Sequence, residues 1–511
     1  MFWFALGLEP LLSFLEKRLK GILVSSLPIE GPTLENMPPQ LPPMTQHYKV
    51  ISYADDVKPA VTTMAEFTLV DNACSLLERA AGVKLHRDPS SDKVKFLPLG
   101  RWRGTLSQED LPNHCQYITI SDHLDFVGVQ LHATYTQTRK SNGNQVVNRI
   151  KNTTNPWKAG KFMALTMRPF SANSYALSKV WFKCSSISMR QSDISNINTA
   201  IKSWLYQDLL QKPGELTLYR NCKDGGLGLL NVKYRALALL IRTFMETASH
   251  PAFRHSLYHE ILFRYYVLEE VSLSRPDFTP YYDAKFFEMI KYYHNNSPLN
   301  ISVLSLRQWY RLLLEDKVLM SPANESGPAY LLPVRCESLQ PDSNWNYAWQ
   351  LMRTSGLSSN CSSFLFKLVH LLLPTQDRVH RLGLTRNNTE GLCLLCRSER
   401  EDLLHSFFFC SASAEAGLVT LGWAQELVPC LTQEHSLRLD VVDDILTTDE
   451  ELALVTIIGH GLGYIWERRI RKKKVQLYEI RAEMEATVSL LRKSRHRKAG
   501  DIIFNIISCE K

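Results

Sequence analysis

The chain has 511 residues, of which 45% are hydrophobic and 22% are charged, so it is long enough for several domains with substantial cores. Its net charge of +8 fits a polyanionic partner, although many proteins without such a partner share it. Eleven cysteines without a secretory leader favour a reducing intracellular compartment, nucleus or cytoplasm, and argue against secretion. The apolar residues 452–466 are too few to span a bilayer, so no membrane partner is expected.

The first region predicts both helices and strands. The N-terminal segment predicts a helix that ends near Gly21, and the proline-rich residues 28–43 predict a loop. A second helix is predicted for residues 63–81, because Thr63 and Glu66 have capping-box spacing and a glycine follows. Strand-like segments lie at residues 50–53, 57 onward, 93–99 and 126–131.

Amphipathic helices predominate after about residue 150, as in residues 232–248. The polar residues 321–344, which contain proline and serine, predict a linker. A small unit rich in cysteine and histidine follows near residues 393–410, and a basic helical segment closes the chain. The predicted fold class is therefore α+β, with the strands confined to the first part.

An acidic pair, Asp55 and Asp56, joins the first two strand-like segments, which predict a β-hairpin with the pair at its tip. Polymerases hold two divalent ions with carboxylate oxygens, and adjacent aspartates on a rigid hairpin suit Mg²⁺ or Mn²⁺. Ala54 before them leaves room for a primer end, and Tyr53 can support it. The alternative is that two aspartates simply make a good turn.

The surrounding segments resemble, in order, the polymerase palm of non-LTR (LINE-type) retrotransposon reverse transcriptases. The palm-like segments are residues 4–12, 53–56, 76–85 and 125–131, the last similar to the primer grip. Later segments resemble the thumb of this family at residues 201–204 and 225–229, and the approach to its C-terminal zinc-binding-like domain at residues 345–349 and 373–381.

This resemblance implies an RNA-directed DNA polymerase whose partners are an RNA template and a DNA target or primer. It makes Asp55 the principal Mg²⁺ ligand with Asp56 beside it, and places Tyr53, Ala54, Phe126 and Gly128 near the primer. The family has a further metal-binding aspartate on an earlier strand, together with fingers. None of the acidic residues before Tyr53 lies on a predicted strand. The resemblance therefore implies an N-terminally truncated enzyme, inactive alone and without dNTP binding. The alternative is a non-enzymatic nucleic-acid-binding remnant or an expressed fragment of a retroelement.

The segments together predict five regions. These are a partial palm at 1–135, a helical thumb and connector at 136–320, a linker at 321–344, a zinc-binding-like reverse-transcriptase-associated domain at 345–430, and a helical region with a basic tail at 431–511.

The Cys/His unit has the arrangement C-x₂-C-x₈-H-x₄-C, made by Cys393, Cys396, His405 and Cys410. A closely spaced cysteine pair followed by a histidine and a cysteine is typical of structural zinc, since four protein ligands leave no open position for catalysis. The alternative is that these residues simply pack in a core.

Two basic runs stand near the C-terminus. The first contains Arg468, Arg469, Arg471, Lys472, Lys473 and Lys474, and the second contains Arg492, Lys493, Arg495, Arg497 and Lys498. Such runs neutralise phosphates and predict binding to RNA or DNA, while a solvated helix face or a nuclear-import signal is the alternative. A weaker candidate track contains Arg149, Lys151, Lys158, Lys161 and Arg168 near Trp157 and Phe162.

Overall fold

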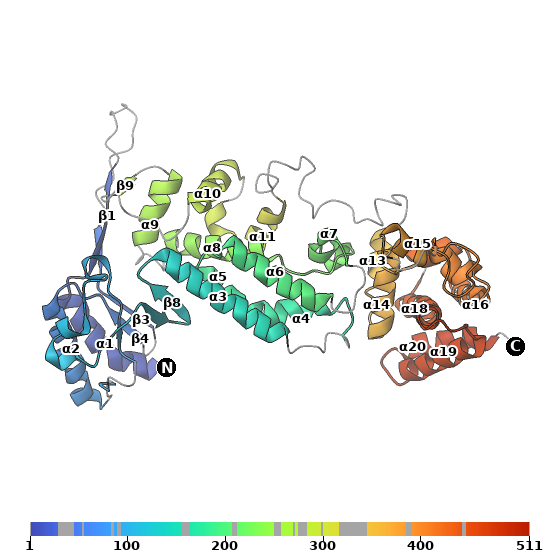
Figure 1. Ribbon diagram of the computed structural model, residues 1–511, viewed down its shortest axis with the longest axis horizontal. Helices are drawn as coiled ribbons and strands as arrows, with labels where there is room; N and C mark the ends of the chain where they lie inside the picture. The colour runs from blue at the N-terminus through green and yellow to red at the C-terminus, as the bar shows by residue number, and fades with distance from the viewer. Residues whose placement is uncertain are drawn as a thin grey trace, which may run out of the picture. The chain divides into compact units, whose positions relative to one another are not determined.

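The computed structural model shows a mostly helical α+β protein (Figure 1). The residues that it describes are 2–28, 45–53, 56–82, 86–88, 93–155, 163–206, 212–249, 257–268, 271–273, 284–297, 300–315, 345–384, 390–441 and 446–509. Nearly all of the predicted loop 28–43 and the whole of the predicted linker 321–344 lie outside them. Within the described ranges, no helix combines the length and apolarity that crossing a membrane requires.

The chain forms two compact units, each built from several segments. The first contains residues 1–149, 179–197 and 232–313, and the second contains residues 150–178, 198–231 and 314–511. The five regions inferred from the sequence stay predictions.

The acidic hairpin lies in the first unit. Strand β3 (Val50–Tyr53) pairs antiparallel with β4 (Asp56–Pro59), and Tyr53 stands opposite Asp56. The predicted antiparallel pairing of the two strands is confirmed, and Asp56 is the first residue of β4. Helices α1 (Phe2–Arg18) and α2 (Met64–Ala81) pack together beside these strands through a small apolar cluster.

Helix α2 begins and ends as its sequence predicts. Thr63 and Glu66 form a capping box, and Gly82 ends the helix with a φ of +69° that favours glycine. The Glu66 carboxylate also accepts the Lys20 N–H at 2.9 Å, which connects the start of α2 to the end of α1. The helix boundary is thus set by local hydrogen bonds that the sequence encodes directly.

The remaining strands are short. Strand β1 (Ile22–Pro28) pairs with β2 (Thr45–Tyr48) and β9 (Val271–Leu273). Strands β5 (Lys95–Phe96) and β6 (Thr119–Ile120) are parallel. The strand predicted at 126–131 is a hairpin instead, in which β7 (His123–Phe126) pairs with β8 (Val129–His132) around a turn at Val127 and Gly128.

Helices complete the first unit. Their ranges are α3 (Tyr135–Thr154), α8 (Val232–Ser249), α9 (Leu257–Phe263), α10 (Ala284–Asn296) and α11 (Leu306–Glu315). On α8 Leu240, Ile241 and Phe244 are buried, whereas Leu237 is half-buried. The Phe244 ring packs edge-on against Phe287 of α10, with 5.7 Å between the ring centroids.

Two further helices, α5 (Ser178–Ser186) and α6 (Gln191–Leu205), lie between α3 and α8 in the sequence. The other α-helices and two π-helical turns belong to the second unit. They are α4 (Arg168–Ser171), the π-helical turn η6 (Ala172–Ala176), α7 (Glu215–Tyr219), α13 (Trp345–Leu351), α14 (Ser359–Val369), α15 (Gln376–Arg381), the π-helical turn η11 (His405–Phe409), α16 (Ala414–Gln425), α17 (Gln433–Arg438), α18 (Thr448–Ile470), α19 (Leu477–Arg492) and α20 (Arg497–Cys509).

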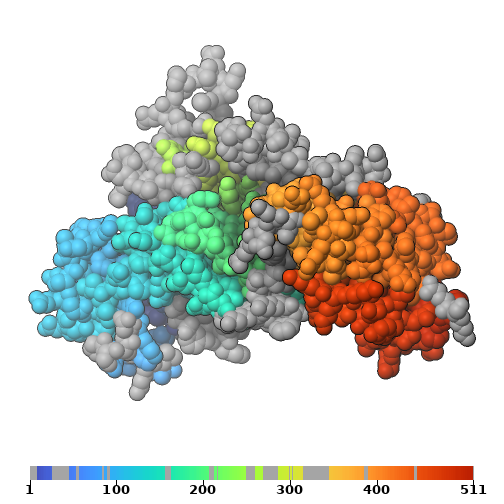
Figure 2. Space-filling view, turned by 45° about the vertical axis from the view of Figure 1, so that its right-hand side comes forward, coloured from blue at the N-terminus to red at the C-terminus, as the bar shows by residue number. Residues whose placement is uncertain are grey.

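One hydrophobic core unites the C-terminal helices. It runs from Trp345 to Ile507, so residues on both sides of position 430 share it. Helix α18 is buried around most of its circumference, which explains why residues 452–466 are apolar without a helical period. Figure 2 shows the last helices lying directly against residues 345–440. The C-terminal segment is therefore part of a folded core.

The glycine turn at 225–228 packs on this core. Gly225 has a φ of +77°, and a Cβ built there would lie 2.4 Å from the Trp349 ring. Trp349 stacks in turn on His370, with centroids 5.1 Å apart. The turn therefore needs glycine both for its backbone conformation and for close approach to the indole.

Candidate metal centre

The first two cysteines of the Cys/His unit lie on a tight hairpin. The Cys393 N–H donates to the Glu399 carbonyl at 2.8 Å, and the Glu401 N–H donates to the Gly391 carbonyl at 3.0 Å. Between them Arg397 has a φ of +59°, which reverses the chain. The Leu395 N–H points at the Cys393 Sγ at 3.4 Å, and N–H donors of this kind favour a thiolate. The hairpin thus presents both sulfur atoms on one side.

His405 and Cys410 are brought together by the π-helical turn η11. The Cys410 N–H donates to the His405 carbonyl at 2.8 Å, five residues earlier. This wider turn suits an H-x₄-C spacing, because five residues complete about one turn. The Asp402 carboxylate accepts the His405 N–H at 2.7 Å and fixes the start of the turn.

The distances between the four donor atoms are close to those around one tetrahedral metal ion. All lie within 4.8 Å of one another, with 3.7 Å between the Cys393 and Cys410 Sγ atoms and 3.3 Å between Cys396 Sγ and His405 Nε2. A tetrahedral Zn²⁺ with ordinary bond lengths separates two sulfurs by about 3.8 Å, and sulfur from nitrogen by about 3.6 Å. The donor set and its spacing therefore fit a structural zinc ion, as the sequence predicts.

The thiols of the two hairpin cysteines differ in pKa. Burial raises the pKa of Cys393 to about 11. Burial acts in the same direction on Cys396, but hydrogen bonds from the Ser398 side chain and from the backbone of Ser398 and Glu399 lower the pKa of Cys396 to about 6. Zinc binds the thiolate, so metal binding at neutral pH releases protons from this site.

Glu399 orients the histidine ligand. Its carboxylate lies 3.0 Å from His405 Nδ1, which leaves Nε2 facing the sulfurs. A carboxylate behind a metal-bound imidazole fixes the ring tautomer and strengthens the ligand. The sequence pattern does not single out Glu399, because a glutamate in a polar segment such as 397–402 is typical of a solvated surface.

The comparisons with known proteins agree with this geometry. Residues 333–416 match the sequence model of a family described as zinc-binding in reverse transcriptase, and this range includes all four donor residues. A search among curated proteins finds no match to the chain. Residues 333–416 are therefore similar to a zinc-binding region of reverse transcriptases.

The acidic hairpin is described only in part. Ala54 and Asp55 lie outside the described residues, and Tyr53 and Asp56 are placed by their backbone as the facing ends of β3 and β4. Their assignment to Mg²⁺ and a primer stays a prediction.

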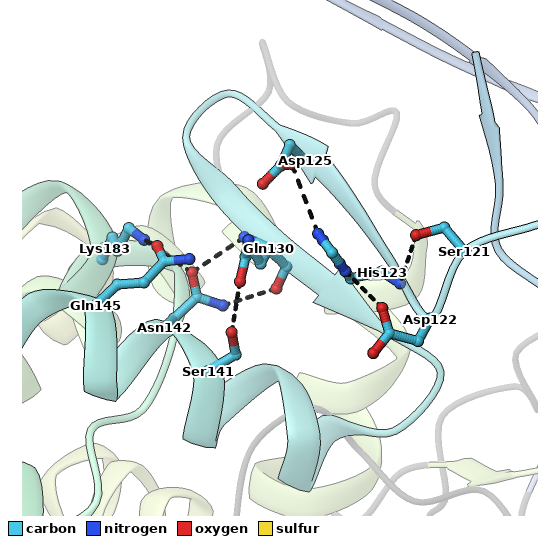
Figure 3. A network of polar contacts seen from close by, with 9 residues as sticks. All are labelled: Ser121, Asp122, His123, Asp125, Gln130, Ser141, Asn142, Gln145 and Lys183. Carbon is cyan, nitrogen blue, oxygen red and sulfur yellow. Dashed lines mark hydrogen bonds and ion pairs between the residues drawn. The ribbon is translucent and has the colours of Figure 1, made fainter. Parts of the chain in front are cut away.

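The second predicted primer-proximal segment, β7–β8, is fixed firmly to α3. Phe126 ends β7, and Gly128 lies in the exposed turn. The Asn142 side chain pairs with one backbone position of β8, accepting the Gln130 N–H at 3.0 Å and donating to its carbonyl at 2.7 Å. The buried Lys183 donates to the same Asn142 oxygen at 3.0 Å (Figure 3). The hairpin therefore has a defined position relative to α3.

The side chains of the first basic run do not all lie on the protein surface. Arg469 is only 2% exposed and is ion-paired with Glu401, so its assignment to nucleic acid is wrong. Arg468 is held by Glu479 at 3.2 Å, whereas the four residues 471–474 are exposed. Helix position causes the difference, because Arg469 lies on the core-facing side of α18.

The residues of the weaker basic track also differ in exposure. Arg168 is buried and donates to the Leu205 carbonyl at 2.8 Å, which excludes it from a phosphate-binding surface. Arg149 and Lys151 are exposed on α3. Lys158, Lys161, Trp157 and Phe162 lie outside the described residues.

Proposed function

We propose that this chain belongs to a reverse transcriptase of the non-LTR retrotransposon type, an RNA-directed DNA polymerase, and carries its Tyr-Ala-Asp-Asp hairpin together with its zinc-binding region. The observation that carries the proposal is the Cys₃His cluster inside the segment that matches a zinc-binding family of reverse transcriptases. The order of the palm-like and thumb-like segments before it supports the same assignment.

In this proposal Asp55 and Asp56 supply carboxylates to Mg²⁺ or Mn²⁺. The ions would activate the primer hydroxyl and neutralise the nucleotide phosphates. The antiparallel register of β3 and β4 sets Tyr53 opposite Asp56, which supports a hairpin at this motif. Because two ions bring four positive charges, one acidic pair supplies only part of the carboxylate needed.

The nucleic-acid surface is proposed to include the exposed loop after α18. Its four basic residues are Arg471, Lys472, Lys473 and Lys474. The Val475 N–H donates to the Ala412 carbonyl at 3.4 Å, which holds this loop beside the segment that follows Cys410. Tyr478, 71% exposed at the start of α19, offers a ring on which an unpaired base can stack.

Primer extension on an RNA template tests the enzymatic part. The 511-residue chain is compared with its Asp55→Ala variant, in Mg²⁺ and in Mn²⁺. We expect no extension by either protein, because ligands and nucleotide positioning beyond the hairpin are needed. Extension that Asp55→Ala abolishes would contradict this expectation and make the chain an active polymerase. Silence of both proteins with retained RNA binding supports a nucleic-acid-binding role for these residues.

A further inference from the structure

A buried ion pair is attached to the cysteine hairpin of the metal centre. Glu401, in the segment between Cys396 and His405, is fully buried, and Arg469 of α18 is 2% exposed. The two side chains contact each other through the Arg469 Nη2 and a Glu401 carboxylate oxygen. They join the cysteine hairpin to a helix that is distant in the sequence.

Both charged groups have further partners. The Glu401 carboxylate accepts the Gln376 N–H at 2.8 Å and the Leu394 N–H at 3.2 Å, and Leu394 directly follows Cys393. The Arg469 guanidinium lies over the Trp466 ring, 4.4 Å from its centroid. Burial lowers the pKa of Arg469 to about 10, while the nearby Cys393 acts in the opposite direction. Arg469 stays positively charged at neutral pH.

A gain in folding stability alone does not explain why this ion pair is buried. A buried ion pair loses hydration and is often no better than apolar residues of the same size. The charge of the neighbouring metal centre explains the buried pair better. Three thiolates and one neutral imidazole around Zn²⁺ leave one net negative charge, formed in a protein interior where it is poorly screened.

We propose that Arg469 is a positioning residue of the zinc centre, whose guanidinium is paired with the glutamate that accepts the Leu394 N–H and offsets the negative charge of the zinc–thiolate cluster. Arg469 binds no metal and acts through Cys393 and the hairpin that Glu401 anchors. The proposal rests on zinc as the occupant of the cluster, and it is independent of any polymerase activity.

If charge compensation matters, substitutions of Arg469 and of Glu401 should have different effects on zinc affinity. Zinc must displace thiol protons at neutral pH, and removing the arginine charge leaves Glu401 as an uncompensated anion that disfavours this deprotonation. Replacing Glu401 by glutamine breaks the same pair but leaves the cation in place. A purely structural role predicts equal losses of zinc affinity for both changes, whereas charge compensation predicts a loss concentrated in the arginine variants.

The experiment measures zinc affinity by competition with a chelator on the full chain. The variants are Arg469→Met, Arg469→Gln, Arg469→Lys and Glu401→Gln, with Arg468→Met as the control on the adjacent residue. Substitution of Co²⁺ for zinc reports through its absorption spectrum whether all four ligands still bind. We expect the uncharged Arg469 variants to bind zinc about 10- to 100-fold more weakly with an intact Co²⁺ spectrum. Arg469→Lys, Glu401→Gln and Arg468→Met should stay much closer to the wild type.

Arg469→Gln keeps the test decisive if Arg469→Met does not fold, because glutamine still bonds to Glu401 without a charge. Equal weakening in Arg469→Gln and Glu401→Gln would overturn the proposal in favour of a packing role. Unchanged affinity in a folded Arg469→Gln protein would also overturn it.

Discussion

Glu399 is a side chain outside the ligand set that contacts one of the candidate zinc ligands. Its contact with His405 Nδ1 leaves the other ring nitrogen as an acceptor that faces the cysteines. We expect Glu399→Ala to weaken zinc binding about 10- to 100-fold without loss of stoichiometry at saturating zinc, because the imidazole loses its orienting partner.

Chelator competition measures this effect. The matched control is Glu415→Ala, an exposed glutamate near the start of α16. Identical affinities for the two variants would mean that Glu399 is only a surface charge.

We expect His370 to make the second unit sensitive to acid. Burial lowers the pKa of this imidazole to about 4, so the unfolded chain takes up its proton at a higher pH than the folded chain does. The stability that depends on neutral His370 is complete above about pH 6.5 and decreases as the pH falls toward 4, by on the order of 3 kcal/mol.

The His370→Phe variant keeps a ring on Trp349 but does not titrate. Urea unfolding at several pH values should give a smaller loss between pH 6.5 and 4 in the variant than in the wild type. Zinc release in acid affects both proteins, so it cancels in the difference. Parallel pH profiles would contradict the role of His370.

Among the elements, the β7–β8 hairpin combines a firm anchor with a strained turn. Val127 has a φ of +47°, a conformation unfavourable for a β-branched residue, and Gly128 follows with +76°. Turns with two positive φ values prefer Asn-Gly. Val127→Asn should therefore stabilise the hairpin by about 1 kcal/mol.

Hydrogen exchange of residues 123–132 measures this change, with Gly128→Ala as the control that should lower protection. Slower exchange in Val127→Asn is the expected result. Faster exchange would show that the valine side chain packs in a way that outweighs its backbone strain.

The exposed loop after α18 is the element that we expect to contact phosphates. Each lysine that neutralises a phosphate of single-stranded RNA adds about −0.7 to the slope of log affinity against log salt. Replacing Lys472, Lys473 and Lys474 by alanine should therefore make the slope shallower by about 2.

The control replaces three exposed residues of the second basic run, Lys493, Arg495 and Lys498. The loop variant should change the salt slope more than the control does. The reverse result would assign the phosphate contacts to the second run.

Local patterns predicted local structure well. The Thr63–Glu66 capping box and the Cys/His spacing each encode their geometry within a few residues, and both are confirmed. Arg469 was misassigned because a run of basic letters does not reveal which side of a helix faces a core. The Glu401–Arg469 contact could not be predicted either, since it joins segments that only the tertiary fold brings together.

At the scale of the whole molecule, the metal centre belongs to a larger core than its sequence spacing indicates. Phe407 and Phe408, between His405 and Cys410, are buried in the same cluster as α14, α16 and α18. Loss of zinc should therefore increase hydrogen exchange across residues 345–509 and leave the first unit unchanged. Increased exchange confined to residues 390–412 would show that the metal stabilises only its own loops.

The central claim, a structural zinc ion bound by Cys393, Cys396, His405 and Cys410, is tested most directly by counting metal. Native mass spectrometry and elemental analysis of the purified chain should give one zinc per chain. Cys393→Ser and Cys410→Ser should lose it, while Cys430→Ser, at an exposed free cysteine, should keep it. Full zinc content in Cys393→Ser and Cys410→Ser, or no zinc in the folded wild type, would contradict the account.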